Sequence, residues 1–289
     1  MIHLEFEKSR GLAAELEIHD KGEDRSEEKL KKLQRKIRQP EDFYKNGLDD
    51  ELKDLSVFLR NVQSPLKILD IGFGSGRSTL YMASLRHSVS GLEPSLSACL
   101  LLEGISAHVG LPLRVFQGPA EAMNQIPDED FDLIVFNSSF HHCDSPLEVL
   151  ELCHQRLKRN GRIFLNEPVL KPFRTKSWFF RMLKEEPTRM GHYGGNEHIY
   201  YSWEYRRLLH KAGFSDIEMR PSPSVLDLRK EIKRMAQAQV KGEKIYSRPR
   251  LFLHALWNST LVGISAFPPL RRALLASSLM PLNFVAHRR

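Results

Sequence analysis

The stretch that most constrains the fold is Leu66–Thr79, which reads LKILDIGFGSGRST. An apolar run ends in three glycines at alternating positions, Gly72, Gly74 and Gly76, and a helix-compatible segment follows them. This order of strand, tight glycine turn and helix is typical of the first unit of a doubly wound α/β sheet. Glycine suits such a turn because a backbone without Cβ bends sharply and lets a ligand approach closely.

The residues around the glycines separate two classes of cofactor. A dinucleotide fingerprint has its third glycine at the place that Arg77 takes here, and the acid Asp70 is unusual for a nicotinamide site. The stretch resembles motif I of the class I S-adenosylmethionine (SAM) methyltransferases, roughly hydrophobic-Leu-Asp-hydrophobic-Gly-x-Gly-x-Gly. The resemblance implies a SAM site whose first contacts are Asp70, Gly72, Phe73, Gly74 and Gly76.

Two further positions fit a nucleoside cofactor. Glu93 follows an expected strand over residues 87–92, and an acid at such a strand end is placed to accept from both ribose hydroxyls. In the resembling family, the loop after the third strand carries an Asp that accepts from the adenine amino group. Pro119 stands at that place here, so the adenine is expected to meet the backbone N–H of Ala120.

Candidate bases follow the fourth strand, expected over residues 130–136. The strand leads into Asn137-Ser138-Ser139-Phe140-His141-His142, and the resemblance implies a cofactor contact at Asn137 and a functional histidine after it. Histidine has a suitable pKa for taking the proton of an alcohol. Because neighbours on a strand point to opposite faces, we expect only one to enter the site: His142, or failing that His141. A histidine that merely orders its loop is the alternative.

Residues 168–199 form a long connection before the next helix, and connections of this length usually carry function or form a lid. Aromatic and imidazole side chains gather in and just after it, and together they suit an acceptor ring with polar substituents, such as a sugar or a phenol. The expected acceptor residues are His192, Tyr193, His198, Tyr200 and Tyr201. A packed aromatic lid without substrate contacts is the alternative.

The resemblance covers about residues 45–220, with its segments in the family's order. It predicts a doubly wound, Rossmann-like α/β fold. We expect an N-terminal helical segment over 1–44, a methyltransferase domain over 45–223, and a basic, apolar helical extension over 224–289. The N-terminal segment is expected to be a solvated helix that packs by one apolar stripe, and a lid over the cofactor site is the alternative. Hydrophobic residues make up 41% and charged residues 27% of the 289-residue chain, as is ordinary for a globular protein.

Charge is distributed unevenly along the chain. From Lys241 onward there are eight basic residues and one acid, so this tail carries the whole net charge of +7. A neutral remainder disfavours a nucleic-acid groove at the active site. The apolar and basic residues of 224–289 suit helices that pack on the domain itself or on a second subunit, or a segment that binds an anionic membrane surface.

Three widely spaced cysteines fit a reducing compartment and argue against a disulfide frame or a zinc site. The first residues lack the layout of a signal peptide, so we expect a cytoplasmic protein, peripheral at a membrane if the tail binds lipid. The expected function is SAM-dependent methyl transfer, without a metal, to an oxygen, in preference to a nitrogen or carbon, of a small or lipid-linked acceptor such as a glycan or a secondary metabolite. Two alternatives stay open: a nicotinamide-dependent oxidoreductase, and a non-catalytic scaffold subunit at a membrane.

Overall fold

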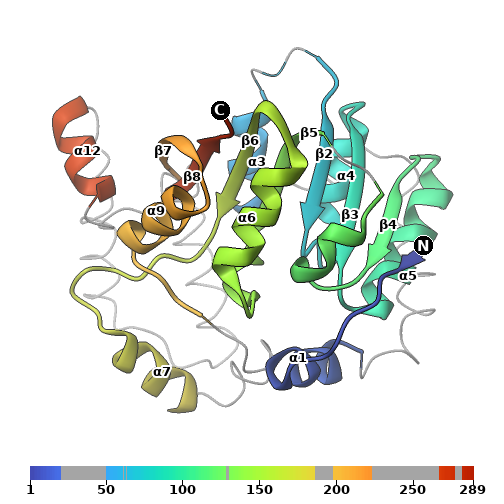
Figure 1. The fold of residues 1–289 in the computed structure, drawn as a ribbon, viewed down its shortest axis with the longest axis horizontal. Helices are drawn as coiled ribbons and strands as arrows, with labels where there is room; N and C mark the ends of the chain where they lie inside the picture. The colour runs from blue at the N-terminus through green and yellow to red at the C-terminus, as the bar shows by residue number, and fades with distance from the viewer. Residues whose placement is uncertain are drawn as a thin grey trace, which may run out of the picture.

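The computed structural model describes residues 1–20, 50–60, 62, 64–127, 130–185, 198–222, 267–276 and 282–289. Within them lies an eight-stranded sheet with the order β1-β4-β3-β2-β5-β6-β8-β7 (Figure 1). The strands are Ile2–His3 (β1), Lys67–Ile71 (β2), Ser88–Glu93 (β3), Arg114–Gln117 (β4), Phe131–Asn137 (β5), Leu157–Asn166 (β6), Ser215–Pro221 (β7) and Leu282–His287 (β8).

The order of the parallel strands places the glycine turn at the centre of the sheet. The chain winds outward from β2 on both sides, through β3 and β4 in one direction and through β5 and β6 in the other. All these strands are parallel, so their carboxyl ends share one edge, with the crevice of a doubly wound sheet at β2. The expected fold class is confirmed, and Gly72, Glu93 and Asn137 all lie at or just past this carboxyl edge.

The last strand corrects the expected boundary at residue 223. β8 lies between β6 and β7 and is antiparallel to both, with Ile163 opposite Ala286 and Met219 opposite Phe284. Five of its six residues are buried. The end of the chain is therefore part of the central sheet. A strand with apolar side chains on both of its faces is buried most completely when it lies between two other strands. The expectation of a purely helical extension over 224–289 is wrong for these residues.

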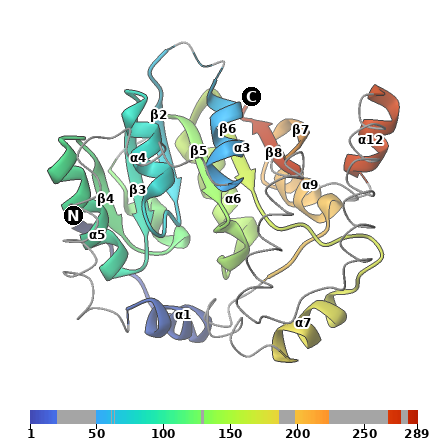
Figure 2. The ribbon, with the colours of Figure 1, turned by 180° about the vertical axis from the view of Figure 1, so that it is seen from behind.

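The N-terminal residues also join the sheet, where only helix was expected. β1 pairs with β4 at the edge of the sheet, and Leu4 N donates to Gln117 O at 2.9 Å. Two hydrogen bonds then tie the backbone of Glu5 to the side chain of Gln125. Helix α1 (Arg10–Asp20) follows and lies beyond the carboxyl edge in both views (Figures 1 and 2). The rest of the N-terminal helical segment expected over 1–44, from residue 21 onward, is outside the described residues.

Helices cover both faces of the sheet. The helices α3, α4 and α5 pack on one face, and η2, α6, α9 and α12 pack on the other. Helix α7 lies beyond the carboxyl edge, on the same side of the sheet as α1 (Figure 1). Their bounds are Asp50–Leu59 (α3), Arg77–Ser84 (α4), Leu96–Val109 (α5), Ala120–Gln125 (η2), Phe140–His142 (η3), Pro146–Arg156 (α6), Lys176–Glu185 (α7), Ser202–Lys211 (α9) and Pro268–Ala276 (α12).

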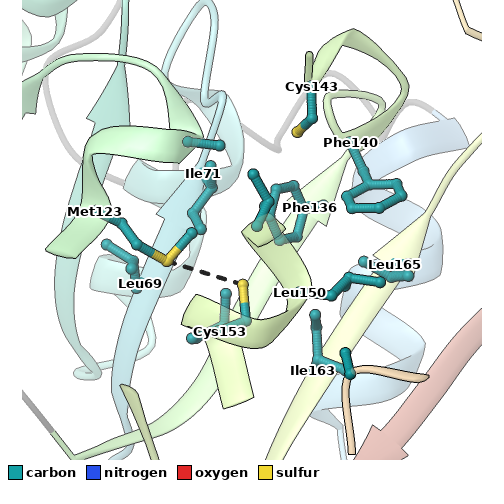
Figure 3. Close-up of a cluster of buried hydrophobic side chains, with 14 of the residues drawn as sticks. Leu69, Ile71, Met123, Phe136, Phe140, Cys143, Leu150, Cys153, Ile163 and Leu165 are labelled. Carbon is teal, nitrogen blue, oxygen red and sulfur yellow. Dashed lines mark hydrogen bonds between the residues drawn. The ribbon is translucent and has the colours of Figure 1, made fainter. Parts of the chain in front are cut away.

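Alternation along the strands divides the core into two layers. Ile68 faces the α3 and α4 layer, whereas its neighbour Leu69 faces the α6 layer. Figure 3 shows the second layer, in which Cys153 of α6 points toward Met123 of η2, with 3.9 Å between their sulfur atoms. Full burial of a side chain such as Phe136 stabilises the fold by about 1.5–3 kcal/mol. This packing holds the carboxyl ends of β2 and β5 side by side.

Candidate active site

The three glycines of the turn meet different surroundings. All have positive φ, at +69° for Gly72, +51° for Gly74 and +75° for Gly76, which L-residues rarely adopt. A Cβ at Gly72 would lie 2.3 Å from Ser139 Cβ, and a Cβ at Gly76 would lie 2.7 Å from Leu102 Cδ1. A Cβ at Gly74 would meet no atom of the described residues within 4 Å. The protein's own packing thus requires the outer two glycines, whereas the middle one borders open space.

Glu93 ties the end of β3 to that middle glycine. Its Oε2 accepts from Gly74 N at 2.8 Å, and its Oε1 accepts from Ser95 N at 3.0 Å. The residue is buried. An ionised carboxylate offers about four acceptor sites, so it can accept from several donors at once. An anionic acceptor held against an open glycine backbone therefore fits the ribose hydroxyls of the expected cofactor.

Asp70 lies under the first turn of α4. Its Oδ2 accepts from Ser78 Oγ and Thr79 Oγ1, both at 2.7 Å. Complete burial raises the pKa of Asp70 to about 6, and the two hydroxyl donors offset part of that rise. Its Oδ1 has no hydrogen-bond partner among the described residues. A buried acceptor without a donor, two residues before Gly72, fits the ammonium group of the methionine part of SAM.

Two other expected cofactor residues have mainly structural side chains. Phe73 is buried in the core, where it leaves no room for a Cβ on Gly91 of β3: that atom would lie 2.7 Å from the ring. Its backbone carbonyl accepts from Gly76 N at 2.9 Å. Ala120 is the first residue of η2, directly after Pro119, and its methyl group is buried. Both side chains thus pack within the protein, and the cofactor contacts expected of Phe73 and Ala120 stay a prediction.

A buried acid organises the turn that carries the two histidines. Glu167, one residue past β6, accepts from the backbone N–H of Ser139 at 3.0 Å, of Phe140 at 2.9 Å and of His141 at 3.4 Å. Its Oε2 also lies 2.6 Å from His141 Nδ1. The Glu167 side chain is fully buried. Four donors around one carboxylate fix the shape of the turn and the plane of the His141 ring.

The two histidines lie side by side, which corrects the expectation that they point to opposite faces. They belong to the 3₁₀ helix η3, and their ring centroids are 4.1 Å apart. Strand alternation does not apply there, because Ser138, with φ +60°, turns the chain out of β5. His141 is buried beside Glu167, whereas His142 is partly exposed. The expected role of His142 as the base stays a prediction.

Asn137 ends β5 directly opposite Asn166 of β6. Its Oδ1 accepts from Asn166 Nδ2 at 2.8 Å, and Ser138 N donates to Asn166 O. Asn137 therefore lies at the carboxyl edge, two residues before Ser139, whose hydroxyl donates to Ile71 O at 2.6 Å. These contacts join the glycine turn to the histidine turn.

Three of the five expected acceptor residues are described. His198 N donates to His141 O at 3.0 Å, so the chain returns to the histidine turn at that point. Tyr200 forms a bridge with Val169 and packs its ring on Phe140, and its burial raises its pKa to about 12. Tyr201 donates its hydroxyl to Arg174 O at 2.8 Å. His192 and Tyr193 lie outside the described residues.

Glu167 and Ser139 are the residues of this site that sequence reasoning missed. Glu167 stands in Asn166-Glu167-Pro168, directly after an apolar strand. An acid at the carboxyl end of a buried parallel strand faces the ligand edge. The same signal identified Glu93, so it was available for Glu167.

Comparisons with known proteins agree with this geometry. Residues 69–165 match the methyltransferase domain family. A ubiquinone biosynthesis O-methyltransferase of Pseudomonas aeruginosa is 27% identical over 120 residues, which cover 42% of this chain and 50% of that enzyme. A beauvericin nonribosomal cyclodepsipeptide synthetase of Gibberella fujikuroi is 33% identical over 102 residues, 34% of this chain and 3% of the synthetase. The chain spans about half the length of the curated O-methyltransferases it matches.

Solved structures show the same fold. A phosphoethanolamine N-methyltransferase 2 of Haemonchus contortus, in complex with phosphomonomethylethanolamine and S-adenosylhomocysteine, covers 83% of this chain with a TM-score of 0.56 and 16% identity. The alignment spans 52% of that chain. At this identity the likeness concerns the fold alone. The glycine turn, the acid after β3 and the family match coincide on residues 69–165, and the chain therefore carries a methyltransferase domain of the class I, SAM-dependent kind.

Proposed function

We propose that this protein transfers the methyl group of SAM to an oxygen of a small or lipid-linked acceptor. The observation that carries the proposal is the contact of the Glu93 carboxylate with Gly74 N at 2.8 Å, beside backbone that borders open space. The 27% identical ubiquinone biosynthesis enzyme is an O-methyltransferase, which supports oxygen as the acceptor atom. A sugar, a phenol and a secondary metabolite all present such an oxygen.

The cofactor would lie across the carboxyl edge of β2 and β3. Glu93 would accept from the ribose hydroxyls, and Gly72–Gly76 would contact the methionine end. Asp70 would accept from the methionine ammonium group, which supplies a donor that its buried Oδ1 lacks among the described residues. Ala120 would meet the adenine through its backbone. When bound, SAM supplies a methyl group already activated by its sulfonium.

The histidine turn would handle the proton of the acceptor. A hydroxyl keeps its proton at neutral pH, so transfer to oxygen gains from a base. His142 would take this proton, while His141, held by Glu167, packs against the His142 ring and orients it. A positioned base typically contributes about 100- to 10,000-fold. The alternative role for these histidines is to order the turn.

The open space at Gly74 gives a sharp test. A Gly74→Ala variant adds one methyl group, at φ +51°, that meets no atom within 4 Å in the part of the chain that the structure describes. Gly110→Ala is its matched control: Gly110 has φ +68°, a Cβ there likewise meets no described atom within 4 Å, and Gly110 ends α5 away from the turn. Both variants bear a similar backbone cost of about 1–2 kcal/mol. Only Gly74→Ala is expected to weaken SAM binding, by at least about tenfold or 1.4 kcal/mol.

Isothermal titration calorimetry with SAM, S-adenosylhomocysteine and NAD measures this directly. Tight binding of NAD in place of SAM would support the oxidoreductase alternative, and equal SAM affinity in the two variants would place the cofactor elsewhere. Methyl-labelled SAM with a panel of phenolic, sugar and amine acceptors then identifies the acceptor atom by mass spectrometry. SAM binding without turnover on any acceptor would favour the scaffold alternative.

A further inference from the structure

Exposed aromatic side chains gather in one part of this chain. Among the described residues, the aromatic rings with the greatest exposure are Phe173 at 65%, Phe267 at 64%, Trp203 at 48% and Phe180 at 41%. Three of these four lie on α7, on the loop before it and on the first turn of α9. Large apolar side chains that stay exposed together mark an interaction surface.

Direct contacts join the loop before α7, the start of α7 and the start of α9. The hydroxyl of Tyr201 donates to Arg174 O at 2.8 Å, and the Tyr201 ring stacks on Trp203 with centroids 4.1 Å apart. The guanidinium of Arg174 lies 3.9 Å from the centre of the Trp178 ring. Lys176 Nζ forms a salt bridge with Glu204 Oε1 at 2.8 Å, which links the start of α7 to α9.

We call this set the aromatic-basic surface. Its members are Phe173, Arg174, Trp178, Arg181, Tyr201 and Trp203.

The charges between the rings have one sign. Residues 171–181 carry Lys171, Arg174, Lys176 and Arg181 and no acid, and residues 198–204 add only Glu204, which Lys176 pairs. The surface therefore has net positive charge. Tryptophan and tyrosine prefer the boundary between water and lipid, and basic side chains among them favour anionic headgroups.

The surface lies on the side of the molecule where the reaction edge is. Helix α7 is beyond the carboxyl ends of the parallel strands, on the same side as α1 (Figures 1 and 2). Tyr200 and His198, which directly precede this part of α9, contact the histidine turn. A bilayer bound here would lie beside the expected acceptor residues.

We infer that the aromatic-basic surface binds an anionic phospholipid bilayer and that the acceptor is an amphiphile taken from it. The statement about the acceptor rests on the proposed function, whereas the binding itself does not. The described helices include none long and apolar enough to span a bilayer. Attachment would therefore be interfacial, with the rings at headgroup depth and the arginines on the lipid phosphates.

Vesicle flotation of the full chain tests the inference. The vesicles contain phosphatidylcholine alone or phosphatidylcholine with phosphatidylglycerol. We expect binding to the anionic vesicles at low salt and much weaker binding at about 1 M salt, where the screening length falls to about 3 Å. Arg174→Gln/Arg181→Gln should lower the partition coefficient about 25-fold, or about fivefold per charge. The charge-matched control Arg60→Gln/Arg114→Gln removes two exposed arginines elsewhere and should retain most of the binding.

The rings have their own matched pair. Phe173→Ser/Trp203→Ser should lower binding at least tenfold, whereas Leu100→Ser, at a side chain 46% exposed on α5, should leave it unchanged. Equal binding by the surface variants and their controls would overturn the inference, as would a chain that ignores anionic vesicles. Self-association without lipid that Phe173→Ser/Trp203→Ser abolishes would overturn it in favour of a protein partner. SAM affinity, measured on the same variants, should not change, so a failure of lipid binding is distinct from a failure of the proposed function.

Discussion

Replacing Glu167 by alanine should lower the free energy of unfolding by about 3–5 kcal/mol, because several buried hydrogen-bond donors then lose their acceptor. The carboxylate accepts from three backbone N–H groups, at 2.9, 3.0 and 3.4 Å, and from His141 Nδ1 at 2.6 Å. Each buried donor left without an acceptor costs about 1–3 kcal/mol. The longest of these bonds contributes least, and such costs do not add fully, so the expected total lies below the simple sum.

Glu167→Gln removes the negative charge of the side chain and keeps its shape, so it tests the two contributions separately. The amide oxygen can still accept from Ser139 N and Phe140 N, and the amide nitrogen can donate to His141 Nδ1 once that ring changes tautomer. The expected cost is about 1–3 kcal/mol, the strength of one hydrogen bond to a charged group. Glu218→Ala is the control, because it removes an exposed ion pair with Arg220 and should change stability by less than about 0.5 kcal/mol.

Urea unfolding, followed by circular dichroism, ranks the three variants. A Glu167→Ala protein within about 1 kcal/mol of the wild type would refute the account of the histidine turn. A turn that loosens should also lower kcat more than it weakens SAM binding. A larger loss of kcat than of SAM affinity separates a positioning role of Glu167 from a general loss of stability.

Three further results are expected. Gly72→Ala should be strongly destabilising in urea unfolding, since its Cβ would lie 2.3 Å from Ser139 Cβ at φ +69°, and adding Ser139→Gly should recover part of the loss; additive costs would contradict the clash. The folded-state pKa of Asp70, about 6, exceeds its ordinary value of 3.8, so the folded state binds the extra proton and stability falls as pH rises from about 4 to about 6. Asp70→Asn should remove about 3 kcal/mol of that fall, and an unchanged slope would contradict the burial of the carboxylate. The Tyr200 phenol, with its pKa raised to about 12, should stay protonated at about pH 10, where an ordinary tyrosine is half ionised; the phenolate absorbance of the wild type minus that of Tyr200→Phe measures this.

Local pattern was sufficient for the part of the fold built from consecutive units. The run Ile68–Ile71 before three alternating glycines predicts a buried strand and a turn, and both are found. Glu93 was predicted at a strand end and ends β3 there. Such signals work because each strand, turn and helix of a doubly wound sheet is specified within about 30 residues.

The elements that sequence reasoning missed depend on distant partners. The sequence of β8 is a short apolar run, and periodicity alone cannot assign such a run to a helix or a strand. It forms a strand between β6 and β7, where Phe284 pairs with Leu165, more than a hundred residues earlier in the sequence. The histidines were misplaced for a related reason: Ser138, at φ +60°, ends the strand before them. Glu167 follows β6, whereas the backbone N–H groups that donate to it follow β5, so its role depends on the pairing of these two strands. The association expected for residues 224–289 stays a prediction outside β8, since residues 223–266 are not among those described.

A crystal structure of the protein with S-adenosylhomocysteine tests the central claim most directly. The account predicts ribose hydroxyls at about 2.7–3.0 Å from the Glu93 carboxylate oxygens, with the homocysteine end against Gly72–Gly76 and its ammonium group near Asp70. Nucleoside density away from Glu93, or no density at the carboxyl edge of β2 and β3, would contradict it.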